Sequence, residues 1–287
     1  MERIKENFDI RTIKENEYVF CGLKIEIVDN PDGTFYICYS QPDFIPKIKF
    51  IDVNPDLDGK LRASDKLISE FRSLIGSLQW SANMTRPDLS YGVTSLMGKI
   101  GDLRIDDCRK ANKLLRKAKG CHPSLVTCKP LDMSCLRLHI YSDAGFANLN
   151  DMGSQMGHVT FIEDSISRNV IEWKSRKIMR ICRSTFSAEL LACGEAMDYL
   201  IFIKEIFKEW HIQIIKMVLS IDSKGVFENI NNITGETKEK ALKIELARLK
   251  QVVNEGNIHI EWVPTKEIIS DVLTKEMSGL VLLQAMN

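Results

Sequence analysis

Glu189 is a carboxylate on the apolar side of a predicted helix. In the string RSTFSAELLAC, residues 183–193, the side chains of Phe186, Leu190 and Cys193 recur at helical spacing, and Glu189 falls on their side. An ionised carboxylate taken out of water needs a cation, a metal ion or hydrogen-bond donors as partner. Two interpretations remain open: a Glu at the edge of the stripe paired with a Lys or Arg, or a metal ligand joined by other carboxylates.

Three further acids lie where predicted strand ends or helix faces converge. Asp143 ends the first strand of a predicted α/β domain, Asp222 ends its fourth strand, and Asp271 lies in its last predicted helix. Sites in sheets with crossover helices gather at the carboxyl ends of strands. Oxygen-only ligands favour Mg²⁺ or Mn²⁺, and two such ions serve phosphoryl transfer. Taken singly, each acid also fits a helix cap or a first-turn position, so spacing alone leaves the choice open.

The elements that must position these acids follow from the hydrophobic pattern. Three adjacent strands, a long helix, a strand, a helical stretch, a strand and a terminal helix predict an α/β domain with a mixed sheet. Their ranges are 136–143, 157–164, 169–175, 184–210, 217–222, 237–254, 257–264 and from about 265 onward.

The residues before this domain have a different pattern. Residues 17–40 predict a small antiparallel hairpin with Asp32 and Gly33 in its turn, followed by a short helix between Ser40 and Phe50. Helical spacing then predicts three helices, at 64–83, 87–100 and 104–119.

Composition sets wide bounds. The 287 residues are 44% hydrophobic and 27% charged, and Lys plus Arg equal Asp plus Glu at 39 each, so the whole-chain field attracts neither nucleic acid nor anionic membrane. No apolar run has the length of a membrane span, and the first residues lack a signal peptide. We therefore expect an intracellular protein without a membrane partner.

The eight Cys residues are expected to be reduced thiols in this setting. Cys121, Cys128 and Cys135 recur every seven residues near His122 and His139, but the close Cys pair typical of a zinc site is missing. Scattered thiols are the favoured interpretation.

Two segments concentrate positive charge. Residues 108–120 carry six Lys or Arg and no acid, and residues 168–183 carry six against Glu172 alone, directly before the Glu189 helix. The alternatives are a solvated helix face and a charged edge strand that blocks sheet pairing. If they hold nucleic acid, the candidate contacts are Lys174, Ser175, Arg176, Lys177, Arg180, Arg183, Ser184, Arg109, Lys113 and Arg116.

Four strings of the α/β region occur in the order YSDAGFANLNDMGSQMGHVTFI, IEWKSRKIMRICRSTFSAELLA, SIDSKGVFENI and SDVLTKEM. They resemble the ribonuclease H domain in the Pol polyproteins of copia-type LTR retrotransposons. The segment linking polymerase to ribonuclease H is matched by GSLQWSANMTRPDLSYGV, and the end of the reverse transcriptase by YVFCGLKIEI and DGTFYICYSQPDFI.

The resemblance implies a fold, three regions and a chemistry. We expect a ribonuclease H-like mixed five-stranded sheet with flanking helices at 133–287, a helical thumb or connection region at 61–132 and a reverse-transcriptase remnant at 1–60. The family's metal ligands map onto Asp143, Glu189, Asp222 and Asp271, which implies two Mg²⁺ ions, with Mn²⁺ as an alternative. The implied activity is hydrolysis of the RNA strand of RNA–DNA hybrids, with the rest of the Pol polyprotein, the reverse transcriptase, as a partner.

The chain departs from the family pattern in places. Glu236-Thr237-Lys238-Glu239 stands where many members have R-T-K-H, and Ile268 and Ser270 replace the usual Gln and Ala. No Tyr-x-Asp-Asp polymerase motif occurs, so we expect a carboxyl-terminal fragment that does not polymerise DNA, in a cytoplasmic particle or the nucleus. The alternatives are an inactive or host-adopted remnant that binds nucleic acid, and another nuclease of the same superfold such as a resolvase.

Overall fold

The computed structural model describes residues 16–120, 126–149, 151–231, 239–255, 258–277 and 280–286. Cys121 and His122, and the departures at 236–238, lie outside these residues. None of the helices in the described part of the chain has the length and apolar character that a membrane crossing requires.

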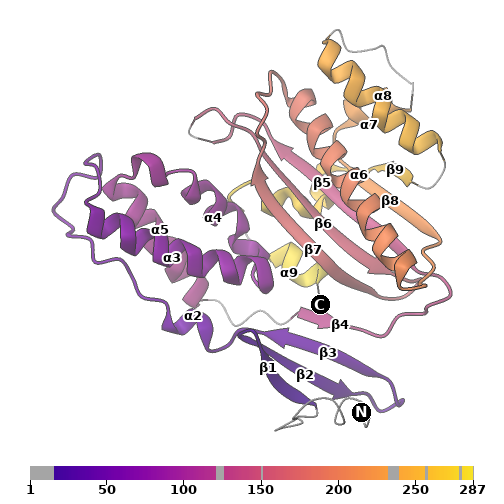
Figure 1. Ribbon diagram of the computed structural model, residues 1–287, viewed down its shortest axis with the longest axis horizontal. Coiled ribbons are helices and arrows are strands. Elements are labelled where there is room, and N and C mark those ends of the chain that lie inside the picture. The colour runs from indigo at the N-terminus through magenta and orange to yellow at the C-terminus, as the bar shows by residue number, and fades with distance from the viewer. Residues whose placement is uncertain are drawn as a thin grey trace.

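The larger part of the molecule is built around a five-stranded sheet in the order β7-β6-β5-β8-β9 (Figure 1). β5, β6 and β7 are antiparallel neighbours, whereas β8 and β9 run parallel to β5. The strands are β5 (Arg137–Gly145), β6 (Gln155–Glu163), β7 (Arg168–Lys177), β8 (Lys216–Ile221) and β9 (Ile258–Trp262). The mixed five-stranded sheet with flanking helices predicted from the sequence is confirmed.

Helices cover both faces of this sheet. One apolar layer is formed by α6, α7 and α8 against β5, β8 and β9, and includes Leu138, Leu190 and Leu219. The bounds are α6 (Thr185–Glu209), α7 (Lys224–Ile230) and α8 (Lys240–Asn254). The opposite face packs on the carboxyl-terminal segments η4 (Ile269–Leu273) and α9 (Leu280–Ala285) through Phe161 and Leu273.

The predicted terminal helix from about residue 265 is interrupted. Two 3-10 helices, η3 (Thr265–Glu267) and η4, are separated by Ile268, whose φ of −77° and ψ of 105° are those of extended chain. Ile268 and Ile269 are both buried. The extended backbone at Ile268 thus interrupts the helix, and Asp271 lies in η4.

A helical unit occupies residues 65–120 and has its own core, centred on Phe71, Leu78 and Leu115. It consists of α3 (Asp65–Met84), η1 (Pro87–Leu89), α4 (Ser90–Met97), η2 (Ile100–Asp102) and α5 (Ile105–Gly120), and the short α2 (Phe44–Lys47) packs beside it. The predicted breaks between the three helices agree with these bounds to within a few residues.

The helical unit docks on the edge strand β7 through defined hydrogen bonds. The indole Nε1 of Trp173 donates to the Ala82 carbonyl at 2.7 Å, and Thr94 Oγ1 donates to the Ser175 carbonyl at 3.1 Å. The helical unit thus packs against the α/β domain (Figure 1).

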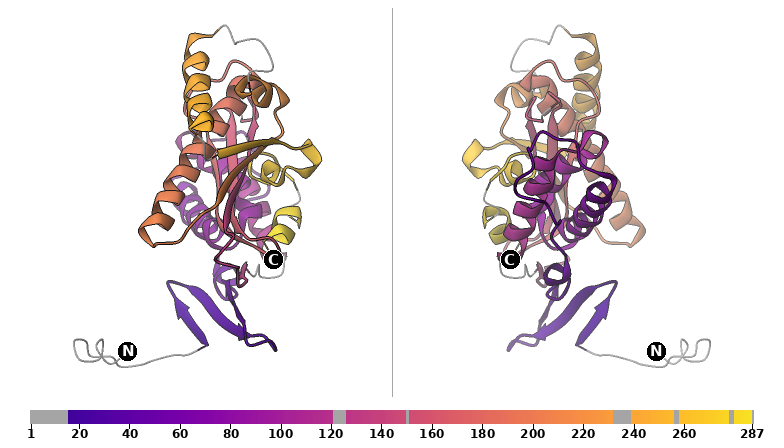
Figure 2. Two further views of the ribbon diagram at one scale, coloured as in Figure 1. Left: turned by 90° about the vertical axis from the view of Figure 1, so that its right-hand side faces the viewer. Right: turned by 90° about the vertical axis from the view of Figure 1, so that its left-hand side faces the viewer.

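A second, antiparallel sheet has the order β1-β2-β3-β4. Its strands are β1 (Glu17–Phe20), β2 (Leu23–Asp29), β3 (Phe35–Ser40) and β4 (Val126–Cys128). β1 to β3 project from one end of the molecule (Figure 2). β4, which follows the helical unit, was not predicted as a strand; it pairs with β3, so the first sheet draws on residues from two of the predicted regions. The division at residues 60 and 132 stays a prediction.

Candidate metal centre and nucleic-acid interface

Asp143 and Asp222 lie side by side at the carboxyl ends of two parallel strands. Ser142 of β5 pairs with Ile221 of β8, and Asp143 and Asp222 directly follow these partners. Leu138 and Ile140 alternate along β5 and pack in the core on the α6 side, which fixes the position of this strand. The sheet register thus brings the two carboxylates to one edge.

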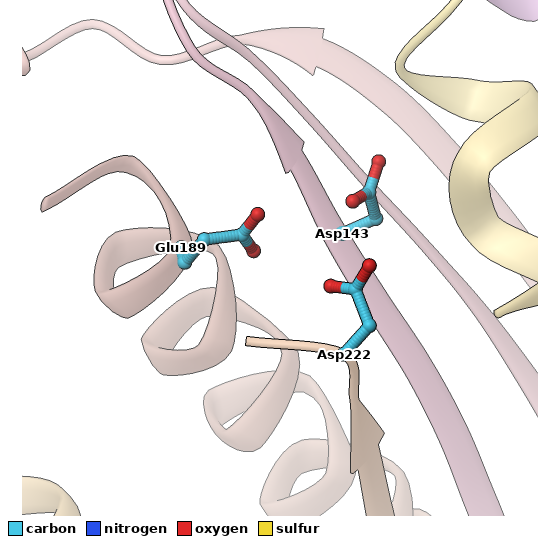
Figure 3. Close-up of side chains that lie close together, drawn as sticks. All are labelled: Asp143, Glu189 and Asp222. Atoms are coloured by element: carbon cyan, nitrogen blue, oxygen red, sulfur yellow. The ribbon is translucent and has the colours of Figure 1, made fainter. Parts of the chain in front are cut away.

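Glu189 reaches the same point from α6. Ser184 caps this helix in a reciprocal arrangement with Ser187, which fixes its first turn. Figure 3 shows the carboxylate of Glu189 pointing from the helix toward those of Asp143 and Asp222. Carboxylate oxygens of the three residues lie within 4.8 Å of one another. Among the described residues, this is the one such group of His, Cys, Asp or Glu side chains; Cys128, Cys135 and His139 form no cluster of that kind.

Burial gives the cluster unusual acid–base properties. Asp143 is 1% exposed and Glu189 8%. Burial, with the neighbouring carboxylates of Asp143 and Asp222 adding to it, raises the pKa of Glu189 to about 9. Burial likewise raises the pKa of Asp143 to about 7, although Lys275 and a hydrogen bond from Thr274 oppose the rise. These carboxylates need a positively charged partner to be ionised together at neutral pH.

Asp271 is the fourth predicted ligand, and the structure places it outside the three-carboxylate group. Its Oδ1 lies 2.5 Å from Lys275 Nζ, and the same ammonium is 3.8 Å from Asp143 Oδ2. Asp271 is therefore connected to the cluster through a lysine. Its role as a metal ligand stays a prediction.

The residues after Asp271 are functional candidates that the sequence reasoning did not single out. Thr274 Oγ1 donates a hydrogen bond to Asp143 Oδ2, which orients that carboxylate. Ser175 Oγ, in β7, donates to the Leu273 carbonyl at 2.5 Å and holds this segment on the sheet. The signal was the string LTK within SDVLTKEM, whose threonine and lysine carry the polar groups nearest Asp143.

The backbone of β6 approaches this segment closely at Gly157. A Cβ atom at this position would lie 2.5 Å from Leu273 Cβ, nearer than real contacts allow. The absence of a side chain at residue 157 thus permits η4 to lie against the sheet and to present Asp271, Thr274 and Lys275 beside Asp143.

The basic strand β7 has more acidic partners than its local sequence indicates. Arg176 Nη2 lies 2.5 Å from Glu195 Oε2, and Lys174 Nζ is 3.4 Å from the other oxygen of the same carboxylate. Lys177 pairs with Asp151. Arg180 and Arg183, which follow the strand, are exposed.

The predicted contacts Ser175 and Ser184 have structural roles as hydrogen-bond donor to Leu273 and as N-cap of α6. Lys174 and Arg176 contact α6 through Glu195, and Arg180, Arg183 and Ser184 directly precede that helix. Their contact with nucleic acid stays a prediction.

The predicted contacts on α5 separate into two groups. Arg109 donates to Asp106 Oδ1 at 2.9 Å and to the Pro55 and Leu57 carbonyls, so it closes a loop of the helical unit. The guanidinium of Arg116 lies 5.7 Å from the ring centre of Phe50. Lys113, in contrast, lines an open groove with Lys110 and Lys117. The basic residues of α5 that line a groove are therefore Lys110, Lys113 and Lys117, whereas the predicted contacts were Arg109, Lys113 and Arg116.

Comparison with known proteins finds similar Pol polyproteins of transposons. No protein-family model matches the chain. It is 28% identical over 212 residues, 73% of its length, to "Retrovirus-related Pol polyprotein from transposon RE2" of Arabidopsis thaliana. It is 24% identical over 258 residues, 88% of its length, to "Transposon Ty1-ER2 Gag-Pol polyprotein" of Saccharomyces cerevisiae. The chain spans 14% of the length of each of these proteins.

Similar solved structures include ribonuclease H domains. The RNase H1 of the archaeon Halobacterium salinarum is 18% identical, with a TM-score of 0.38 over 50% of this chain and 98% of that one. LC11-RNase H1 in complex with an RNA/DNA hybrid is 21% identical, with a TM-score of 0.39 over 50% of this chain and 99% of that one. The foamy viral protease-reverse transcriptase in complex with double-stranded DNA is 12% identical, with a TM-score of 0.48 over 87% of this chain and 38% of that one.

Proposed function

Because this chain is a relative of the Pol polyproteins of copia-type retrotransposons, we propose that it hydrolyses the RNA strand of RNA–DNA hybrids with divalent metal ions, as a retrotransposon ribonuclease H. The observation that carries the proposal is the convergence of Asp143, Glu189 and Asp222, whose carboxylate oxygens lie within 4.8 Å of one another. The rest of a Pol polyprotein, with its reverse transcriptase, is the proposed partner.

The donor set fits Mg²⁺ or Mn²⁺. All three side chains offer hard oxygen ligands, and no His or Cys belongs to the group. Burial, with repulsion from neighbouring carboxylates as a smaller cause, raises the pKa of Glu189 and that of Asp143, and a bound divalent cation would stabilise their ionised forms. Asp143, Glu189 and Asp222 would hold one ion, and Asp271 together with Asp143 would contribute to a second. When bound, such ions activate a water for attack on a phosphodiester and stabilise the departing oxygen.

The protein's own residues prepare the site for this reaction. Thr274 fixes the orientation of the Asp143 carboxylate through its hydroxyl group. Lys275 neutralises part of the acidic charge while keeping a half-exposed ammonium at the edge of the site. The exposed Arg180 and Arg183 follow β7 and are suited to phosphates of a bound strand. RNA would be distinguished from DNA by contacts with the 2′-hydroxyl.

A cleavage assay tests the proposal. The purified chain is incubated with Mg²⁺ and a hybrid labelled on either strand, beside duplex DNA of the same sequence. We expect cleavage of the RNA strand alone. Asp143→Asn should keep the fold, checked by circular dichroism, and should lower the rate by about a hundredfold or more, because changing a residue that only orients a metal ligand already costs about 10- to 100-fold.

Each other outcome points to a different function. Hybrid binding without cleavage by the native chain would replace the proposal with a nucleic-acid-binding remnant. Cleavage of branched or duplex DNA would replace it with a resolvase-type nuclease.

A further inference from the structure

A groove lies between the helical unit and the segment that carries Lys275. It encloses about 400 Å³ and is walled by α4, the residues after it, α5, Asn148 and residues 275–277. Five lysines line it: Lys99, Lys110, Lys113, Lys117 and Lys275.

Three of the lysines form a row along α5. Lys110, Lys113 and Lys117 are spaced three and four residues apart, so they follow one face of the helix. At 1.5 Å per residue, the row is about 10 Å long. Phosphates on one strand of a duplex advance by about 3.4 Å along its axis, so the row spans about three phosphates.

The acids of the groove do not cancel this charge. Asp88 is buried and makes a two-point ion pair with Arg86, through bonds of 2.8 Å each. Asp107 is 6% exposed, and its Oδ2 accepts a hydrogen bond from the Arg104 amide. Glu276 is the remaining acid among the lining residues and is exposed.

Two of the groove lysines face solvent without an acidic neighbour. Across the described ranges, Lys99 and Lys113 have no carboxylate within ion-pair distance, whereas Lys110 is 3.8 Å from Asp107. Lys117 Nζ donates to the backbone carbonyl of Asp88 at 3.3 Å, which leaves its charge unneutralised. The groove therefore has an excess of positive charge on a fixed helical support.

The groove adjoins the acidic cluster at Lys275. Lys275 lines the groove, and its ammonium lies 3.8 Å from Asp143 Oδ2. Asn148, which also lines the groove, donates from Nδ2 to the Thr274 carbonyl at 2.6 Å, which ties the groove wall to the residue that orients Asp143. A strand that leaves the acidic cluster past Lys275 would thus reach the groove.

We propose that this lysine groove binds the sugar-phosphate backbone of the nucleic acid where it extends beyond the cleavage point, through Lys110, Lys113 and Lys117. The inference rests on the proposed function for the identity of the nucleic acid. It assigns the contact on α5 to the lysine row rather than to Arg109 and Arg116, which contact the segment before the helical unit at Leu57 and Phe50.

Salt-dependent binding tests the proposal. Fluorescence anisotropy of a labelled RNA–DNA hybrid is measured in EDTA, where no cleavage occurs, between about 50 and 200 mM salt. The variant Lys110→Gln/Lys113→Gln/Lys117→Gln should bind more weakly. Its slope of log affinity against log salt should fall by about 2 to 3, close to one for each phosphate that the protein no longer neutralises.

A matched control removes the same formal charge elsewhere. Lys208→Gln/Lys216→Gln/Lys243→Gln changes three exposed lysines at the carboxyl end of α6, the start of β8 and α8, none of which lines the groove. Its slope should match that of the native chain. The single variant Lys113→Gln, at a side chain without a hydrogen bond in the described part of the chain, guards against misfolding and should lower the slope by about 1.

The outcomes separate this proposal from the proposed function. Equal slopes for the native chain and the groove variants would overturn the proposal that the groove binds nucleic acid, even if the native chain cleaves hybrids. A reduced slope in the groove variants but not in the control would support it, even if the native chain fails to cleave.

Discussion

The Lys275 ammonium lies 2.5 Å from the Asp271 carboxylate, four residues earlier in the chain. The same ammonium is 3.8 Å from Asp143, so it bridges the fourth predicted ligand and the most buried acid of the cluster. Although partial burial lowers the pKa of Lys275, the two carboxylates raise it further, and the net shift is upward. This lysine supplies the positive charge nearest the acidic site.

Removing the Lys275 charge should therefore destabilise the metal-free protein. In Lys275→Gln, Asp143 and Asp271 lose their shared cation. Since the lysine side chain is 42% exposed, solvent screens the pair, and we expect a loss of about 1 kcal/mol in the free energy of unfolding. Urea denaturation in EDTA measures it. In excess Mg²⁺ the loss of unfolding free energy relative to the native chain should be smaller. An equal loss with EDTA and with Mg²⁺ would contradict the proposal that Lys275 neutralises the metal-free carboxylates.

The buried carboxyls predict a link between pH, metal and stability. In the folded chain the pKa of Glu189 is about 9 and that of Asp143 about 7, both above their ordinary values. As pH rises from about 4 to about 9, the unfolded chain releases these protons first, so the metal-free protein loses stability over this window.

Divalent metal should reverse this trend, because it binds the ionised carboxylates. The rise in Tm caused by Mg²⁺ should thus be larger at mildly alkaline than at mildly acidic pH. Thermal scans with EDTA or Mg²⁺ at the two pH values measure it. Glu189→Gln, which removes one of these titrations, should flatten the pH dependence in EDTA. A Mg²⁺ effect independent of pH would count against the assigned ligands.

The hydrogen bond from the Trp173 indole is expected to stabilise the attachment of the helical unit to β7. Trp173→Phe keeps most of the apolar contact but leaves the Ala82 carbonyl without its donor, whose bond is 2.7 Å long. Loss of a buried hydrogen bond of this kind should cost about 1 to 2 kcal/mol in urea denaturation. Trp80→Phe, at a tryptophan whose indole has no hydrogen bond in the described part of the chain, is the control. An unchanged free energy of unfolding for Trp173→Phe would show that apolar packing alone carries the attachment.

The local hydrophobic pattern was sufficient to predict the two strands that position Asp143 and Asp222. Alternation along residues 136–143 and 217–222 predicted strands, and the rule that sites gather at carboxyl strand ends predicted that Asp143 and Asp222 meet. The observed register, with Ser142 opposite Ile221, has this consequence. Glu189 was identified from its place on an apolar helix stripe, because an acid in that position requires a partner.

Ion-pair and hydrogen-bond partners that lie far apart in the sequence could not be predicted from the local pattern. Counting charges within residues 168–183 found Glu172 alone, whereas Arg176 and Lys174 meet Glu195 of α6, and Lys177 meets Asp151. The same limit explains α5, where Arg109 was expected to contact nucleic acid together with Lys113. The carbonyls of Pro55 and Leu57, which engage Arg109, lie more than fifty residues earlier in the chain.

The TRPD string, noted only as a family likeness, contains a buried ion pair. Arg86 is 0% exposed and Asp88 6%, and the guanidinium also donates to the Ala118 carbonyl at 3.0 Å. This bond joins η1 to the end of α5, next to Lys117 of the groove. Arg86→Met would leave Asp88 as a buried charge without this partner, and we expect a loss of about 3 to 5 kcal/mol in the free energy of unfolding.

A double-mutant cycle isolates the ion pair from the packing of Arg86. Asp88→Asn alone should also destabilise the chain, because it leaves the guanidinium with a neutral partner. Arg86→Met/Asp88→Asn should lose less than the sum of the single losses, by about 1 to 3 kcal/mol, since neither charge is then buried alone. Urea denaturation of the four proteins gives the coupling. Strict additivity would mean that the two-point contact contributes no coupling, and that Arg86 stabilises the end of α5 through Ala118 and apolar contacts alone.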